Sequence, residues 1–469
     1  MTRVASPIAV ANAGRRPRPL TLWPLVAATF FMVSGGTYGT EDIVSGAGYG
    51  RAILVLVLTP LLWSIPTALM IGELGAALPK EGGYYAWVRR ALGDVWGFQE
   101  AWLSLAASVF DMAIYPTLFV LYLKRLLPWF GSGARGVLAG AAVIGLCVIL
   151  NLAGVRAVAD TSVWLFVVLS APFAAIVVLA PFHHGALAHA SAVPAAGIGI
   201  SGGVLVAMWN YMGWDNASTI AADVHRPHHN YPRAMLGAVG IVALSYVLPV
   251  VAAWYAGTPA AGFDTGSWAD LAGTLGGRWL RAFTAMAAML SAFGMFNALV
   301  LSYSRLPLAM AQDGMLPRAF ARVHRRTGAP WVSIVVLALA WGACLRLGFE
   351  RLVALDIMLY GISLALEFAA LVALRLRAPD LPRAFSVPGG VRGTIAVAVP
   401  PMALLVFSLL QSGRDHLLGA KALLLASGIV AGGFLLYALG GPARSRFRKL
   451  RLIQDSGAAI SGEALGENE

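Results

Sequence analysis

The chain has 469 residues, of which 59% are hydrophobic and only 12% are charged, and its mean hydropathy is +0.74. A soluble fold cannot hide so much apolar surface, so soluble architectures are excluded. A bilayer-spanning helix needs about 20 mostly apolar residues, and a chain of this length has room for about a dozen such helices. The composition therefore indicates an all-α polytopic membrane protein.

The formal net charge of +12 comes from 34 Lys and Arg residues against 22 Asp and Glu residues. These basic residues lie between apolar stretches and not on one soluble face, which is typical of topology signals in a lipid bilayer. We therefore expect no nucleic-acid partner.

The sequence lacks the motifs of enzymes and of metal or nucleotide sites. Cys147 and Cys344 lie inside apolar runs without paired spacing, and the eight histidines lack helical ligand spacing with a carboxylate. There is no P-loop and no G-x-S-x-G motif. We expect no enzymatic activity, no cofactor and no metal.

Apolar runs bounded by charges and by Pro and Gly clusters predict twelve spans. The first five lie near residues 21–49, 52–78, 96–123, 136–154 and 158–182, and the other seven near 200–224, 233–256, 279–306, 331–348, 352–375, 394–411 and 417–439. The predicted units are a tail (1–20), a five-helix unit (21–182), a second five-helix unit (199–375), two additional helices (393–439) and a second tail (440–469).

The basic residues predict the orientation of these spans. If the N terminus is cytoplasmic, most Lys and Arg residues fall on the cytoplasmic side, which also favours an even number of spans. A cleaved signal peptide fits less well, because the first apolar run is too long and lacks a small-residue cleavage site. We expect a multi-pass protein of the inner or plasma membrane, with both tails cytoplasmic and an organellar membrane as the alternative.

Two spans contain interruptions that a lipid-facing helix cannot carry, because unpaired backbone amides in hydrocarbon are costly. The first span contains the glycine-rich run 34–39 followed by Glu41 and Asp42, and the sixth contains the run 209–215. A matched pair of interrupted spans is typical of the binding site of a transporter near the bilayer midplane. For either interruption alone, the simpler interpretation is a glycine kink that lets helices pack closely.

Polar side chains inside other spans are also candidates for function. Ser104, Ser108, Asp111 and Tyr115 share one face of the third span, and we expect that face to look into the helix bundle. The tenth span repeats the pattern with Asp356, Tyr360, Ser363 and Glu367. The alternative to solute contact in the tenth span is a structural role for both acids. Asp356 would then lie at the outer mouth, and Glu367 would pair with an arginine on the cytoplasmic side.

Several segments occur in an order that resembles a known family. They are 35–42 (GGTYGTED), 73–100, 111–116 (DMAIYP), 209–215 (WNYMGWD) with Pro227 and Pro232 behind it, 305–317 and 366–388. Together they resemble the amino acid/polyamine/organocation transporter superfamily, and most closely its plant-type polyamine uptake transporters.

The resemblance implies a leucine-transporter-type fold with a 5+5 inverted repeat, two C-terminal helices and twelve transmembrane helices. It also implies secondary transport that is usually proton-coupled. Gly35 and Gly36 match the unwound backbone of the first span, Trp209 matches an aromatic residue that covers the solute, and Asp215 matches an acidic position used for substrate or protons.

We expect an electronegative cavity where Asp111, Asp215 and one of Glu41 or Asp42 converge. Carboxylates without a buried basic partner call for a cationic solute such as putrescine or spermidine, and aromatic rings add cation–π attraction. The expected substrate-binding residues are Gly35, Gly36, Tyr38, Glu41, Asp42, Asp111, Tyr115, Trp209, Tyr211, Trp214 and Asp215. Carboxylates crowded at low dielectric also hold protons readily, so Asp215, Asp111 and Glu41 are the proton-coupling candidates.

An amino acid is the main alternative substrate, because the amides of Gly35 and Gly36 at a helix end could hold a carboxylate. The chain would then be an amino acid permease or an amino acid/amine exchanger. A channel, and a scaffold or sensor that transports nothing, are further alternatives. The direction of transport and the choice between symport and exchange stay open at this stage.

Overall fold

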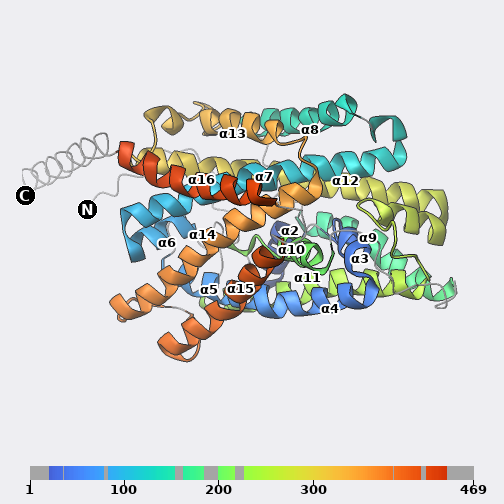
Figure 1. Ribbon diagram of the computed structural model, residues 1–469, viewed down its shortest axis with the longest axis horizontal. Helices are drawn as coiled ribbons and strands as arrows, with labels where there is room; N and C mark the ends of the chain where they lie inside the picture. The colour runs from blue at the N-terminus through green and yellow to red at the C-terminus, as the bar shows by residue number, and fades with distance from the viewer. Residues whose placement is uncertain are drawn as a thin grey trace, which may run out of the picture.

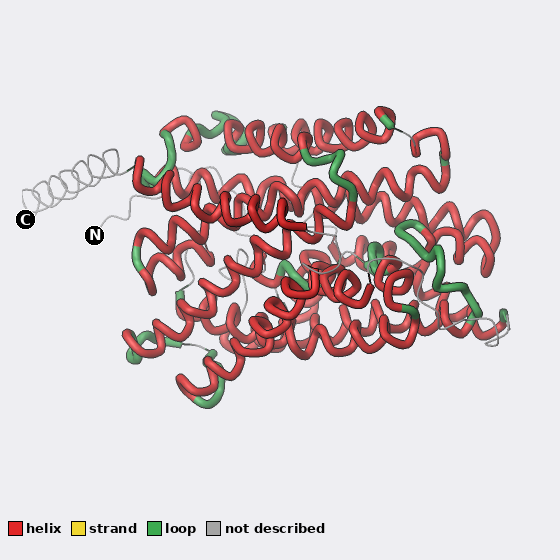
Figure 2. The backbone as a smooth tube through the Cα atoms, viewed as in Figure 1, coloured by secondary structure: helices red, strands yellow, loops and turns green. Residues whose placement is uncertain are grey.

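The computed structural model describes residues 21–34, 36–78, 83–131, 133–153, 162–183, 199–216, 227–383, 385–412 and 419–440. This described part is helical and contains no strand (Figures 1 and 2). Seven of its helical stretches are long and apolar enough to cross a membrane: Tyr49–Ala77, Asp94–Leu126, Ala134–Leu152, Pro232–Tyr255, Ser267–Gln312, Phe349–Arg377 and Gly390–Phe407. The expected polytopic, all-helical class is thereby confirmed.

The helices of the described residues follow one another in the order of the chain. Their bounds are α2 Leu22–Val33, α3 Glu41–Ala47, α4 Tyr49–Thr59, α5 Ile65–Ala77, α6 Gly83–Leu92, α7 Asp94–Leu126, α8 Ala134–Leu152, α9 Ser162–Leu179, α10 Gly199–Asn210, α11 Pro227–Tyr255, α12 Ser267–Gln312, α13 Trp331–Ala343, α14 Phe349–Arg377, α15 Gly390–Ser412 and α16 Gly419–Leu439. A π-helical turn at Pro60–Ser64 joins α4 to α5, and α12 bends at Gly277, where φ is 74°.

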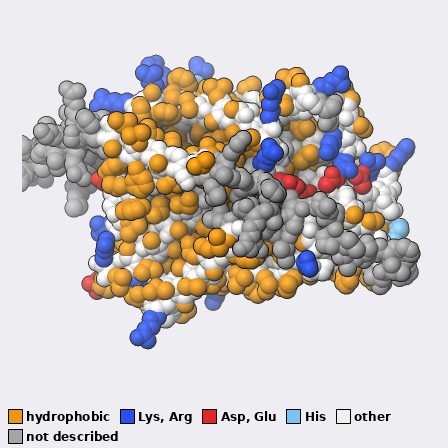
Figure 3. Space-filling model, viewed as in Figure 1, with side chains coloured by type: hydrophobic (Ala, Val, Ile, Leu, Met, Phe, Trp, Pro, Cys, Tyr) orange, Lys and Arg blue, Asp and Glu red, His pale blue; other side chains and the backbone are white. Residues whose placement is uncertain are grey.

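The outer surface of the bundle is apolar in the way that a lipid environment allows. Figure 3 shows a face on which hydrophobic side chains predominate, with Lys and Arg at its edges and, together with Asp and Glu, in a band to the right of centre. Large apolar side chains are exposed on several helices. Trp279 on α12 is 76% exposed, and Leu339 on α13 is 73% exposed. In water such exposure would favour aggregation, whereas in hydrocarbon it is without penalty.

Helix α7 packs against helices from both halves of the chain. It packs along α12 and α14 and also touches α6 and α16, while α10 packs against α3 and α14. Helices α8 and α13 lie side by side along one edge (Figure 1). The polar face of α7 therefore points toward helices that come from the other half of the chain.

The first predicted interruption is present. Helix α2 ends at Val33 and α3 begins at Glu41, and the glycines Gly36 and Gly39 between them have φ values of 118° and 91°, which other residues rarely adopt. Gly35 lies outside the described residues. The second interruption follows α10, which ends at Asn210 before residues 214–216 form a single 3-10 turn.

Ion pairs tie the helices together at the end of the bundle where α6 lies. Glu73 of α5 is buried and bonds to both Arg375 and Arg383, at 2.6 and 3.2 Å, while one of its oxygens also accepts the Val387 amide at 2.7 Å. This arrangement indicates a structural role for Glu73, because every charge in it has a partner.

A second cluster at the same end holds α6 to α7 and α12. Arg89 of α6 pairs with Asp94 at 2.7 Å and with Asp313 at 2.5 Å. Burial, with the nearby Asp313 carboxylate second, raises the pKa of Tyr85, so its hydroxyl keeps its proton and donates to Asp313 at 3.0 Å.

Replacing Glu73 by glutamine should therefore destabilise the fold, because Arg375 and Arg383 would lose their anionic partner. Removing one member of a buried ion pair costs about 3–5 kcal/mol. We expect a clearly lower apparent melting temperature of the purified protein in detergent. The control Asp380→Asn alters an exposed carboxylate and should leave the melting temperature unchanged; equal melting of both variants would contradict the assignment.

Candidate functional site

Three buried carboxylates gather in the middle of the bundle. Asp111 comes from α7, Asp215 from the turn after α10 and Asp356 from α14, and they are at most 9% exposed. Asp356 interacts electrostatically with both others, and Asp111 with Asp215. We call Asp111, Asp215 and Asp356 the central acid group.

Aromatic side chains donate hydrogen bonds to this group. The Trp209 indole Nε1–H donates to Asp111 Oδ1 at 3.3 Å, and the Tyr303 hydroxyl of α12 donates to Asp111 Oδ2 at 3.0 Å. The Tyr360 hydroxyl of α14 donates to Asp215 Oδ1 at 3.2 Å. Both oxygens of Asp356 are buried without a hydrogen-bond partner in the described structure. The group is therefore only partly satisfied by the protein.

Within the described part of the chain, none of the ion pairs includes a member of the central acid group. The carboxylates that have a cationic partner are Glu73, Asp94, Asp264, Asp270 and Asp313. Buried charges in proteins are normally paired or neutralised, so this group is unusual.

Trp209 is where the two interruptions meet. A Cβ atom on Gly39 would lie 3.1 Å from the Trp209 ring, so the first interruption approaches this ring closely. The ring centroids of Tyr115 and Phe349 lie 6.3 and 5.5 Å from that of Trp209. Trp209 thus forms an aromatic wall beside Asp111.

A narrow cavity opens beside this wall. Its lining comes from the first interruption, α7, the end of α10 and α12, with Ser34, Tyr38, Tyr115, Leu118, Tyr122, Trp209, Asn210, Ser291 and Met295 among the residues. Of the predicted site residues, Tyr38, Tyr115 and Trp209 share this cavity. The Tyr38 ring packs edge-on against Tyr122 at 5.4 Å.

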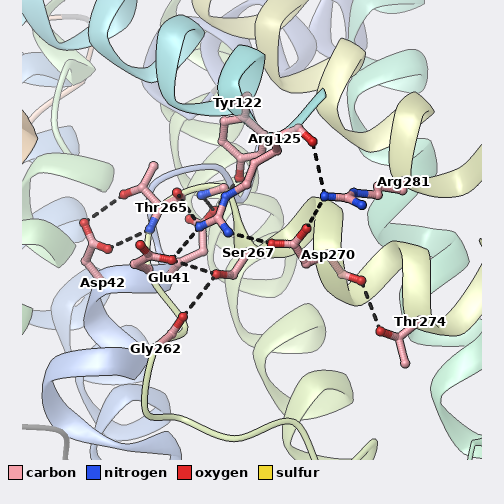
Figure 4. A network of polar contacts seen from close by, with 12 residues as sticks. Glu41, Asp42, Tyr122, Arg125, Gly262, Thr265, Ser267, Asp270, Thr274 and Arg281 are labelled. Atoms are coloured by element: carbon pink, nitrogen blue, oxygen red, sulfur yellow. Dashed lines mark hydrogen bonds and ion pairs between the residues drawn. The ribbon is translucent and has the colours of Figure 1, made fainter. Parts of the chain in front are cut away.

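Glu41 and Asp42 lie in a different environment, shown in Figure 4. Glu41 accepts hydrogen bonds from the Gly39 amide at 2.8 Å, the Gly266 amide at 2.9 Å and the Tyr122 hydroxyl. Asp42 accepts from the Thr265 amide at 2.9 Å and the Thr265 hydroxyl at 2.8 Å. Both carboxylates therefore hold the segment before α12 onto α3, and the structure does not bring them into the central acid group.

The same segment is fastened to the end of α7 by Arg125. Its guanidinium pairs with Asp264 at 2.5 Å and Asp270 at 2.7 Å, and Arg281 pairs with Asp270 at 3.0 Å (Figure 4). These pairs are partly exposed, so each contributes little by itself. Their effect is to fix the position of the segment that Glu41 and Asp42 bind.

Tyr211 and Trp214 shape the second interruption through the backbone. The Tyr211 hydroxyl donates to the Leu56 carbonyl at 2.8 Å, and the Trp214 indole N–H donates to the Tyr211 carbonyl at 2.7 Å. Both side chains are fully buried. Their polar atoms are thus occupied in holding the chain away from helical geometry.

A further pair of carboxylates lies on the α6 side of the central acid group. Glu100 of α7 and Glu367 of α14 are both buried and interact electrostatically with each other and with Asp215. Glu100 is not among the site residues expected from the sequence, although an ionisable residue inside an apolar span is a signal of function. Tyr303 had no such signal.

Glutamine at position 41 should weaken the fold more than it changes solute binding. An amide group cannot accept all the hydrogen bonds that Glu41 receives, and an unsatisfied buried donor costs about 1–3 kcal/mol. We expect a lower apparent melting temperature for Glu41→Gln, whereas Asp264→Asn, at an exposed ion pair, should change it little. An unaltered melting temperature with an altered solute affinity would instead place Glu41 in contact with the solute.

Comparison with known proteins agrees with this architecture. A family model described as amino acid permease matches residues 26–418. Polyamine transporter PUT1 of Oryza sativa subsp. japonica is 36% identical over 89% of this chain and 78% of its own length. Polyamine transporter RMV1 of Arabidopsis thaliana is 36% identical over 83% of this chain and 79% of its own length.

A bacterial relative that is named for a different activity also matches. Serine/threonine exchanger SteT of Bacillus subtilis (strain 168) is 27% identical over 79% of this chain and 84% of its own length. The chain therefore belongs to the amino acid permease family, within the amino acid/polyamine/organocation superfamily of membrane transporters.

Proposed function

We propose that this chain is a secondary active transporter that imports a cationic amine such as putrescine or spermidine by alternating access. The observation that carries the proposal is the central acid group, which is buried and has no basic partner among the described residues. A carboxylate in the bilayer interior needs a compensating charge. A solute with ammonium groups supplies that charge when it is bound.

The surroundings of the central acid group suit an organic cation. Trp209 donates its indole N–H to Asp111, and the Tyr115 ring lies beside Trp209. A cation that lies over the face of such a ring gains about 0.5–2 kcal/mol. The tyrosines and the tryptophan fix the orientation of the acceptor oxygens before the solute arrives. The plant relatives that carry the name polyamine transporter support the same substrate class.

Protons are the proposed coupling ion. When no solute is bound, the central acid group can be neutralised only by protons or by small cations from solution. Asp215 and Asp111 are the proposed carriers, because both belong to this group. Glu41 is a weaker candidate, since its oxygens already accept three hydrogen bonds.

We further propose the leucine-transporter-type arrangement of two inverted five-helix repeats, two C-terminal helices and twelve spans in all. The support is the pair of interruptions after α2 and α10, together with three apolar helices too short to count among the seven long ones: Val167–Phe182, Trp331–Ala343 and Leu424–Leu439. Both termini would then be cytoplasmic in a cell membrane.

Exchange of amino acids is the second candidate function, because the serine/threonine exchanger SteT is a relative. The geometry favours it less. The Gly36 amide donates to Ser34 Oγ at 3.1 Å, so it is not free to hold the carboxylate of an amino acid. Gly35, the other expected donor, lies outside the described residues.

Uptake into proteoliposomes under an imposed pH gradient tests the proposal. Labelled putrescine should accumulate saturably, whereas labelled arginine, leucine and serine should accumulate much less.

The variant Asp111→Asn retains the shape of the side chain and one acceptor oxygen but removes the charge. The ratio of the maximal uptake rate to the half-saturating putrescine concentration should therefore fall about tenfold or more, because a hydrogen bond to a charged group is worth about 1.5–3 kcal/mol.

The matched control is Glu350→Gln, which neutralises an exposed carboxylate at the start of α14 and should transport like the parent. Preferential uptake of serine or leucine would overturn the amine assignment while leaving a transporter. Parent-like amine uptake by Asp111→Asn would show that the central acid group does not bind the solute.

A further inference from the structure

Helices α7 and α14 carry the same polar pattern in opposite directions. On α7 the residues are Glu100, Ser104 and Asp111, and on α14 they are Asp356, Ser363 and Glu367. The spacing is four and then seven residues along α7, and seven and then four along α14. The two helices pack against each other within the bundle.

Contacts between the two helices bring these residues opposite one another. The Ser104 and Ser363 hydroxyl oxygens lie 2.9 Å apart. Glu100 interacts electrostatically with Glu367 on one side of the serine pair, and Asp111 with Asp356 on the other. The helices therefore run antiparallel here, and their facing residues form one polar stripe through the protein interior.

The stripe has an acid pair at each end. Asp111 comes eleven positions after Glu100, and at about 1.5 Å of rise per residue this places them about 16 Å apart along α7. Asp215 interacts electrostatically with Glu100, Glu367, Asp111 and Asp356, so it lies between the two ends. We call Glu100 and Glu367 the α6-side acid pair.

The α6-side acid pair has vacant acceptor atoms. Glu100 Oε1 is held by the hydroxyls of Ser363 at 2.5 Å and Ser104 at 3.1 Å. Glu100 Oε2 and Glu367 Oε2 are buried and have no hydrogen-bond partner in the described structure. The serines thus fix one oxygen of Glu100 and leave the other available to a ligand.

A purely structural role would look different in this protein. Glu73 is equally buried, and two arginines and a backbone amide surround it. No arginine or lysine among the described residues forms an ion pair with Glu100 or Glu367. Two facing carboxylates without such a partner form a site for positive charge.

We propose that Glu100 and Glu367 form a second ammonium-binding subsite, which takes the far end of a linear polyamine whose other end occupies the central acid group. This inference rests on the proposed amine transport and extends it. A short diamine reaches only one acid group at a time. A tetraamine as long as spermine bridges both and places an inner ammonium near Asp215.

Inhibition of putrescine uptake by amines of increasing length tests this subsite. The uptake of labelled putrescine is measured against unlabelled competitors. These are diaminobutane (putrescine itself), diaminooctane, diaminododecane, spermidine and spermine, with monoamines of matching length as controls for apolar contact. The parent protein should bind the long polyamines at least about tenfold more tightly than diaminobutane, the equivalent of about 1.4 kcal/mol. The monoamines should show no such gain.

The variants Glu100→Gln and Glu367→Gln should each remove most of that advantage, so the ratio of inhibition constants for spermine and diaminobutane approaches one. Glutamine keeps the size of the side chain and an oxygen for the serine hydroxyls. Glu350→Gln, at the exposed start of α14, should keep the parent ratio. Gel filtration of each purified variant reports whether it is folded.

The outcomes separate the two proposals. If no amine is transported or inhibits, the proposed function fails. Two results would overturn the subsite while amine transport stands. In the first, putrescine is transported but the inhibition constants of the parent protein do not change with amine length. In the second, both glutamine variants keep the parent's ratio of inhibition constants for spermine and diaminobutane. If a variant does not fold, the dependence of inhibition on amine length in the parent protein decides whether the subsite exists.

Discussion

A carboxylate buried in a bilayer must find a compensating partner, and this constraint governs the structure. The chain meets it in three ways. Glu73 is paired with arginines, while Glu41 and Asp42 receive hydrogen bonds from backbone amides and hydroxyls. Asp111 and Asp215 receive hydrogen bonds from aromatic side chains but have no cationic partner among the described residues. The first two solutions stabilise the fold, and the third leaves a place for a cationic solute.

The interrupted helices give the central acid group its position. Because α10 stops at Asn210, Asp215 leaves the helical path and comes within electrostatic range of α7 and α14. Because Gly39 has no side chain, the first interruption can approach the Trp209 ring, which in turn donates to Asp111. Backbone irregularity in a membrane protein is tolerated where it lines such an interior site.

Sequence periodicity could predict those features that depend on neighbours along one helix. The face of α7 that carries Asp111 and Tyr115, and the interruption after Val33, follow from spacing and from glycine. It could not predict that Glu41 and Asp42 bind a segment more than 200 residues away, because that contact depends on tertiary packing. The packing of α7 against α14 also depends on tertiary structure, so helix periodicity could not predict it. Without that contact, the sequence allowed Asp356 to lie at an outer mouth of the protein. It also gave no reason to place Glu100 in a site with Glu367.

Calorimetric titration of the purified protein with putrescine, in two buffers of different ionisation enthalpy, tests whether the central acid group binds a cationic amine. It reports both the saturable binding of the amine and the protons that binding displaces. We expect saturable binding with net release of protons, because ammonium groups replace the protons that neutralise the empty acid group. Absence of binding, or binding of serine or leucine in its place, would contradict it.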